Sequence, residues 1–234
     1  MKETVQIRKL SLWIFFLPLI AINVCLFIST NFHLFENTIM QVDQIGRTAF
    51  TIPYLDGGTS ISRVSRTFPQ YLIFKPSMIL TGLLLMFYWN YNNSLVNKLK
   101  NTENYKYRFR VFGILSAIFL IIHSIFLGIK FDYQIYKLFR RVILLAFIIF
   151  EIIAQGILVY HFYKIKNKIH EVSNKRVLNL KILLVFLLAS VAILSLPILI
   201  DKGNTQFKHG LEWNYFVGVI TFYILTFFFW KRTT

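Results

Sequence analysis

The chain has 234 residues, of which 56% are hydrophobic, 18% aromatic and only 15% charged, and its formal net charge is +16. An ordinary soluble domain has about 25% charged residues, so this composition excludes a typical soluble protein and indicates a membrane protein. The single cysteine, Cys25, excludes intramolecular disulfides and a cysteine-rich metal site. The excess of basic residues does not indicate nucleic-acid binding, because these residues stand at the ends of apolar runs and in short loops rather than in a basic domain.

Six apolar runs are each long enough to cross the hydrocarbon layer of a bilayer, which takes about 20 residues of helix. Backbone amides in hydrocarbon must be paired within their own segment, so each continuously apolar run is predicted to be a helix. The sequence therefore predicts an all-α, polytopic membrane protein, a six-transmembrane-helix bundle that forms one domain over residues 1–234. The spans are expected near residues 10–30, 70–90, 111–129, 141–163, 178–200 and 211–230.

The distribution of basic residues predicts the orientation of the chain in the membrane. If the N-terminus is cytoplasmic, most of the 26 Lys and Arg residues fall on the cytoplasmic side, Lys181 among them. This pattern predicts that both termini are cytoplasmic. The third loop, KFDYQIYKLFRR, is an exception, because its four basic residues fall on the predicted outer side. The first span ends without a small-x-small cleavage site, so we expect it to remain as an anchor.

The first outer loop contains a polar, turn-rich stretch, IPYLDGGTSISRVSRTFP, at residues 52–69. Pro53 and Pro69 bound it, and its Asp-Gly-Gly sequence is typical of a turn. We expect an ordered cap over the outer mouth of the bundle. Within it, Arg63 and Arg66 are candidates for contact with lipid phosphate, and the alternative is a solvated loop at the membrane interface.

Polar residues inside the apolar runs are candidates for function, because a charge at the bilayer centre costs about 2.5–3.5 kcal/mol. Glu151 stands roughly 15 Å deep in the fourth span, and Gln155 shares its face of the helix. We predict a polar pocket that opens outward, and the alternative is hydrogen bonding between helices, at about 0.6 kcal/mol per bond. The candidate lining residues are Asn23, Ser77, His123, Glu151 and Gln155.

Residues at the start of the last span form a second candidate group. His209 and Glu212 are spaced i,i+3 and so share one side of a helix, but no third ligand stands close enough to predict a metal site. Glu212 is expected either to gain about 0.3–1 kcal/mol from the helix dipole, with Trp213 as an interfacial anchor, or to orient the loop or a lipid headgroup through a charge-assisted bond with His209 or Arg63. The outer-mouth candidates are Asp56, Arg63, Arg66, His209, Glu212 and Trp213.

The segments IPYLDGGTSISRVSRTFP, LIIHSIF and LEWNYFVGVITFYILTFFFW together resemble the Frag/DRAM/Sfk family of membrane proteins. The family includes the damage-regulated autophagy modulators, the post-GPI-attachment remodelling protein and the N-terminal part of a yeast cell-wall protein. The sequence departs from the family pattern at FFFWKR, where an acidic residue is often found. The positions that match are Pro53, Asp56, Gly58, Thr59 and Pro69 in the outer loop, His123 in the third span, and Glu212 and Trp213 in the closing motif.

The resemblance implies work on membrane lipids, namely remodelling of GPI lipid chains, maintenance of lipid asymmetry, or regulation of membrane traffic and autophagy. The first hypothesis is a protein that binds a phospholipid or glycolipid headgroup in an outward-facing cavity. The second is a membrane-embedded acyltransferase or hydrolase that uses His123 or His209 with Glu151 or Glu212 for acid–base chemistry. The third, a small-solute transporter, is disfavoured by the lack of internal repeats and paired helix breaks. No cofactor motif is present, and the sequence indicates no protein partner.

Overall fold

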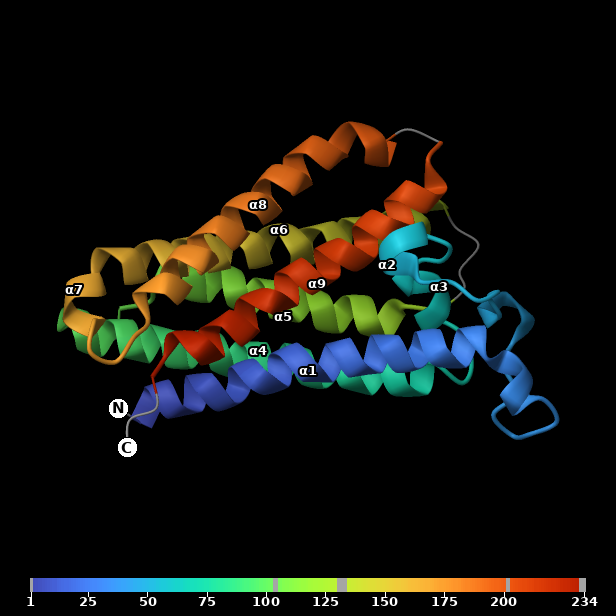
Figure 1. Cartoon of the computed structure of the whole chain (residues 1–234), viewed down its shortest axis with the longest axis horizontal. Helices are drawn as coiled ribbons and strands as arrows, with labels where there is room; N and C mark the ends of the chain where they lie inside the picture. Colours follow the sequence, from blue (N-terminus) through green and yellow to red (C-terminus); the bar gives the residue numbers. More distant parts are fainter. Residues whose placement is uncertain (1, 103–104, 130–133, 201–202, 232–234) are drawn as a thin grey trace.

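Six long helices dominate the computed structural model, which describes residues 2–102, 105–129, 134–200 and 203–231 (Figure 1). Each of the six contains a stretch long and apolar enough to cross a membrane, and the described residues form no strand beyond a single bridge between Ser173 and Trp230. The prediction of an all-α six-helix membrane bundle is confirmed. The long helices are α1 (Lys2–Thr30), α4 (Tyr71–Lys100), α5 (Arg108–Phe126), α6 (Gln134–Lys164), α8 (Lys175–Ile200) and α9 (Thr205–Phe229).

Short helical segments connect the long ones. Most of them belong to the first outer loop, which is ordered as expected. Residues 130–133 of the third loop lie outside the described residues. The short segments are the 3-10 turns η1 (Phe32–Phe35) and η2 (Gln44–Gly46) and the helices α2 (Pro53–Asp56), α3 (Ile61–Ser65) and α7 (Lys166–Ile169).

The long helices pack as a closed ring. Each packs against the next in chain order, and α9 returns to pack against α1. The two ends of the chain lie together at one end of the bundle, and α2 and α3 lie at the opposite end (Figure 1). There α2 contacts α9, and α3 contacts both α1 and α9. The cap, residues 52–69, therefore occupies the end of the bundle away from both termini.

Several helices extend beyond the apolar runs that predict them. Helix α4 continues ten residues past the expected end, and within that extension Leu95 and Val96 are fully buried. It ends at Asn101, which has a left-handed backbone (φ 54°) and whose N–H donates to the carbonyl oxygens of Asn97 and Lys98. The end of the helix is thus set by this capping geometry and not by the end of the apolar run.

Helices α4 and α5 approach each other closely through a small residue. A Cβ atom at Gly113 of α5 would lie 2.3 Å from the indole of Trp89 on α4, and that indole is fully buried. Small residues at such contacts allow membrane helices to pack with large van der Waals area. Gly113 is therefore needed for this contact.

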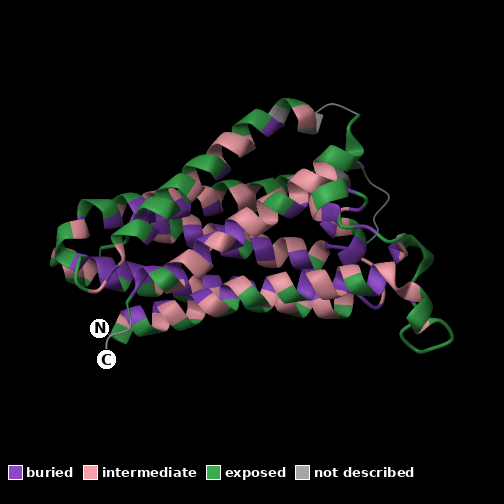
Figure 2. Cartoon of the chain, in the orientation of Figure 1, coloured by how far each residue is buried: buried purple, intermediate pink, exposed green. Residues whose placement is uncertain are grey.

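Helix α8 is only partly packed against its neighbours. Tyr215 OH of α9 donates to the carbonyl oxygen of Leu188 at 3.3 Å, and beyond this point α8 diverges from α9 (Figure 1). Ile193 and Leu194 are 67% and 73% exposed, and exposed positions run along the diverging half in Figure 2, whereas buried positions gather where the helices meet. Because these exposed side chains are apolar, we expect them to face the lipid.

Candidate functional site

The cap is organised around the Asp56 turn. The Asp56 carboxylate accepts hydrogen bonds from the Thr51 hydroxyl (2.6 Å) and from the backbone N–H groups of Gly58 (2.8 Å) and Ile52 (2.9 Å). These bonds, with that from Thr51 the largest cause, lower the pKa of Asp56. Gly57 has a left-handed backbone (φ 61°), and a Cβ atom there would lie 1.8 Å from the carbonyl oxygen of Gln206. The Asp-Gly-Gly turn predicted from the sequence is therefore also the point where the cap meets α9.

Three side chains of α9 hold the cap by its backbone. His209 Nδ1 bonds the carbonyl oxygen of Gly57 at 3.1 Å, and Trp213 Nε1 donates to that of Thr59 at 2.9 Å. Asn214 Nδ2 donates to the carbonyl oxygen of Tyr54 at 2.8 Å. Buried backbone carbonyls need such partners, because a loop lacks the regular backbone hydrogen bonds of a helix or sheet. The outer-mouth candidates His209 and Trp213 thus attach the cap to the last membrane helix.

Glu212 contacts the cap and does not stand at the N-terminus of α9, where the helix dipole would have stabilised it. Helix α9 begins at Thr205, so Glu212 lies in its third turn and outside the range of a terminal dipole effect. Its carboxylate interacts with the backbone N–H groups of Ile61 and Ser62, the first residues of α3. The helix-end role was expected because the apolar run begins at residue 211, six residues after α9 itself begins. Glu212 was therefore taken to stand at the helix N-terminus. Glu212 therefore lies at the start of α3, and its contacts there are not with the expected partners His209 and Arg63.

Asn23, predicted for an interior pocket, instead belongs to the cap. Tyr54 OH of α2 donates to Asn23 Oδ1 at 3.1 Å, while Asn23 Nδ2 donates to the carbonyl oxygen of Leu19. Burial raises the pKa of Tyr54. The ring of Tyr54 also packs edge-on against Trp213, at 4.9 Å between centroids. The first and last membrane helices are thus joined through the cap.

A cationic cleft of about 570 Å³ lies beside the cap, between the ends of α4, α5 and α6 that lie away from both termini. Arg66, Lys75 and Arg140 line it, one from the end of the cap and the others from α4 and α6. Burial, and then the charges of Arg140 and Arg63, lower the pKa of Arg66, because like charges nearby disfavour its charged form. Arg140 Nε is buried and has no hydrogen-bond partner in the part of the chain that the structure describes.

The cleft contains one acidic side chain among the described residues, Asp43. Its carboxylate accepts a hydrogen bond of 3.3 Å from the backbone N–H of Phe68, so part of its bonding capacity is used within the loop. Lys75 Nζ donates to the carbonyl oxygen of Ile125 at 3.1 Å, which holds the ammonium at the mouth of the cleft. Among the described lining residues, the cleft therefore carries a surplus of positive charge. Arg66 was a sequence candidate, whereas Lys75 and Arg140 were not, because only the fold brings them together.

The interior polar cluster consists of Glu151 with three hydrogen-bond donors. Ser116 Oγ of α5 donates to Glu151 Oε2 at 2.6 Å, Gln155 Nε2 donates to Oε1 at 3.0 Å, and Tyr223 OH of α9 also donates to Oε1. Gln155 Nε2 has a second acceptor, the carbonyl oxygen of Val219, at 3.4 Å. The pairing of Glu151 with Gln155 follows from their spacing in the sequence, and Ser116 and Tyr223 are additions from the fold.

The other residues of the predicted interior pocket lie elsewhere. His123 stands seven residues beyond Ser116 on α5, or about 10 Å along the helix, and the charge of Arg140 acts on it. Ser77 accepts, through its backbone carbonyl, a hydrogen bond from Thr81 on its own helix. The structure thus brings Glu151 and Gln155 together, places Asn23 at the cap, and leaves Ser77 and His123 outside the Glu151 cluster.

A buried lysine on α8 was missed from the sequence. Lys181 was assigned to the basic residues of the inner side, but it is fully buried and its Nζ donates to Thr226 Oγ1 of α9 at 2.8 Å. The available signal was its position six residues inside a helix that begins at Lys175. Lys181 also lies inside the span expected at residues 178–200, and counting it with the basic residues of the cytoplasmic side overlooked that position.

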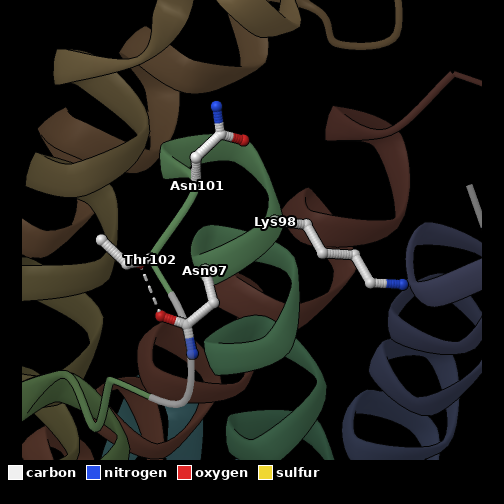
Figure 3. A pocket seen from close by; sticks show the side chains of 4 residues that line it. All are labelled: Asn97, Lys98, Asn101 and Thr102. Carbon is white, nitrogen blue, oxygen red and sulfur yellow. Dashed lines mark hydrogen bonds between the residues drawn. The ribbon is translucent and has the colours of Figure 1, made fainter.

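A polar pocket of about 440 Å³ lies at the opposite end of the bundle, at the end of α4 (Figure 3). Its polar groups serve the local structure. Thr102 Oγ1 donates to Asn97 Oδ1 at 2.9 Å, and Asn97 Nδ2 donates to the carbonyl oxygen of Tyr105 at 2.9 Å. Lys98 points away from the pocket toward α1, where it pairs with Glu3 (Figure 3). These residues close the end of a helix.

Within the described ranges, no three His, Cys, Asp or Glu side chains gather where they could hold a metal ion. No protein-family model matches the chain, and neither a curated protein nor a solved structure matches it. The resemblance to the Frag/DRAM/Sfk family therefore rests on the residues quoted above.

Proposed function

We propose that this integral membrane protein binds the phosphate-bearing headgroup of a membrane lipid in the cationic cleft beside the cap. The observation that carries the proposal is the convergence of Arg66, Lys75 and Arg140 on one cleft, with Arg140 Nε buried and without a hydrogen-bond partner among the described residues. A buried guanidinium N–H without an acceptor is costly, and a phosphate oxygen would remove that cost. The volume of about 570 Å³ lies within the range of pockets that hold small-molecule groups.

The position of the cleft suits a ligand that is itself part of the membrane. It opens at the end of the bundle, where lipid headgroups lie, and its wall includes Phe68 and Leu127 beside the cations. If both termini are cytoplasmic, as the distribution of basic residues predicts, this end faces the lumen or the exterior. Phosphate is common to phospholipids and GPI lipids, so the proposal agrees with the lipid remodelling, lipid asymmetry or autophagy-related roles implied by the Frag/DRAM/Sfk resemblance.

The hydrolase or acyltransferase alternative receives less support. It requires a histidine and a carboxylate that can exchange a proton with a substrate. The bonds of His209 and Glu212 go to backbone groups of the cap, and Glu151 lies in a separate cluster from His123. Binding is therefore favoured over chemistry.

The test measures lipid retained by purified protein in nanodiscs that contain phosphatidylcholine and an anionic phospholipid, by native mass spectrometry. Arg140→Gln should lower retention of the anionic lipid about tenfold, because a charge-assisted hydrogen bond contributes about 1.5–3 kcal/mol. Arg63→Gln is the matched control, since Arg63 is exposed and does not line the cleft. Equal retention by Arg140→Gln and Arg63→Gln would reject the cleft as the binding site.

A further inference from the structure

Side-chain contacts join the ends of α4, α6 and α7 at the end of the bundle that holds both termini. Lys100 is the last residue of α4, Lys164 is the last of α6, and α7 follows α6 at this end (Figure 1). Lys100 Nζ bonds His161 Nδ1 of α6 at 3.0 Å. Lys168 Nζ of α7 donates to the carbonyl oxygen of Leu99 on α4 at 3.2 Å. These two bonds run in opposite directions between the helices and hold their ends together.

Lys164 belongs to the same group of cations. It is spaced i,i+3 from His161, so the two side chains share one side of α6. The charge of Lys164 acts on both His161 and Lys100. Its Nζ lies 4.6 Å from the ring centre of Tyr160, an aromatic residue of the kind found where helices leave the membrane. Three lysines from three helices thus form what we call the lysine cluster, Lys100, Lys164 and Lys168.

The contacts that the structure describes for the lysine cluster are with neutral groups. Lys100 bonds a histidine nitrogen, Lys168 bonds a backbone carbonyl, and Lys164 lies over an aromatic ring. An ammonium group has three N–H donors, and these contacts use one donor each from Lys100 and Lys168. Most donors of the cluster therefore remain for a ligand.

The ion pairs of the described residues include none of the three lysines. At this end Glu3 pairs with Lys98, and the exposed Glu171 lies 4.0 Å from His170. The C-terminal dipoles of α4 and α6 carry about half a negative charge each, so together they offset about one of the three positive charges. The described part of the cluster keeps a surplus of about two positive charges, more than helix-end electrostatics requires.

We propose that the lysine cluster binds an anionic lipid whose headgroup is a phosphate monoester. Such a group carries about −1.5 to −2 charges near pH 7 and has three acceptor oxygens, which matches the surplus charge and the remaining N–H donors. The ligand is a membrane lipid because Lys100 and Lys164 stand where two apolar spans end, at the level of the headgroups. If both termini are cytoplasmic, this is the cytoplasmic leaflet, where anionic lipids are concentrated.

This site goes beyond the lipid cleft of the proposed function and is independent of it, because the cleft lies at the other end of the bundle. It also differs from the general attraction of basic residues to an anionic surface, which depends on the number of charges and not on which lysines converge. Lys166 separates the two cases. Its Nζ lies 4.3 Å from the ring centre of Tyr163, a contact like that of Lys164 with Tyr160. Residues i and i+2 do not face each other along a helical chain, so Lys166 does not share the side of Lys164.

The test is native mass spectrometry of the full chain with two lipids. Phosphatidic acid has a phosphate monoester headgroup, and phosphatidylglycerol carries a single negative charge. Every protein compared carries Arg140→Gln, so that binding at the cleft beside the cap is weakened equally in all of them. The Arg140→Gln parent should prefer phosphatidic acid. Adding Lys164→Gln should lower the affinity for phosphatidic acid about fivefold, the upper value for an exposed ion pair.

Lys166→Gln in the same parent is the matched control and should bind phosphatidic acid as the parent does. Lys164 is exposed and its side chain makes no hydrogen bond among the described residues, so Lys164→Gln should fold normally. Lys100→Gln combined with Lys164→Gln should lower the affinity further.

Three results would overturn the proposal. Equal losses in Lys164→Gln and Lys166→Gln would leave only general attraction to anionic lipid. A parent that binds phosphatidic acid and phosphatidylglycerol equally would contradict recognition of a phosphate monoester. Displacement of phosphatidic acid by an equal concentration of soluble glycerol phosphate would show that the ligand need not be a lipid. Because the parent already carries Arg140→Gln, each of these results leaves the test of the cleft beside the cap unaffected.

Discussion

Trp213 Nε1 of the last membrane helix donates a 2.9 Å hydrogen bond to the carbonyl oxygen of Thr59 in the cap. Both residues are fully buried, so the bond joins two segments far apart in sequence in a place that water does not reach. The cap is therefore part of the packed structure of the bundle. The position of Arg66, at the end of the cap, depends on attachments of this kind.

Trp213→Phe should destabilise the protein by about 1–3 kcal/mol, because it leaves the Thr59 carbonyl buried without a partner. Thermal unfolding of the purified protein measures the change. Trp13→Phe is the control, since Trp13 is 63% exposed on α1 and should unfold as wild type does. Equal unfolding temperatures for the two variants would contradict this role of Trp213.

Glu212→Gln should loosen α3, because a neutral amide replaces the carboxylate that interacts with the Ile61 and Ser62 N–H groups. The expected loss is about 1.5–3 kcal/mol locally, the range for hydrogen bonds to charged groups. Hydrogen exchange should accelerate at residues 61–65 and leave the six membrane helices protected. If lipid binding depends on the position of Arg66, retention of the anionic lipid should fall in the same variant. Unchanged exchange in α3 would show that the carboxylate charge is not needed there.

The Asp56 turn should weaken in acid. Its pKa is lowered in the folded protein by the Thr51 hydroxyl and by backbone N–H groups, so its stabilising contribution is present above the unfolded value of about 3.9 and is lost as the pH falls through the folded value. Protection factors of the Ile52 and Gly58 amides should therefore decrease below about pH 4. Asp56→Asn should show low protection at every pH. A wild type whose protection factors stay constant across this range would refute the linkage.

Gly113→Ala should destabilise the contact between α4 and α5 by about 1–3 kcal/mol, the usual cost of overpacking. The added Cβ would lie 2.3 Å from the Trp89 indole, which cannot move because it is fully buried. Gly156→Ala is the control, since a Cβ atom there would meet Val185 at an ordinary 3.5 Å. Thermal unfolding that ranks the two variants in the opposite order would contradict this packing.

The sequence by itself determined the number and type of the membrane helices. The length of an apolar run and the need to pair backbone amides in hydrocarbon are properties of each segment alone, so six spans could be predicted without knowing how they pack. The Asp-Gly-Gly turn was also predictable, because its geometry depends on adjacent residues. The spacing of Glu151 and Gln155 gave their contact for the same reason.

The tertiary structure decided which side of each helix faces inward. In a soluble protein, the amphipathic pattern of a helix marks its buried side. In a bilayer both the lipid and the protein interior are apolar, so the hydrophobic pattern says little about how each helix is rotated about its own axis. This is why Asn23 contacts the cap rather than a pocket with Glu151, and why Lys181 could be counted with the basic residues of the cytoplasmic side although it is buried. Only the packing of the ring brings Arg66, Lys75 and Arg140 to one cleft, because they come from three segments whose relative positions no local pattern encodes.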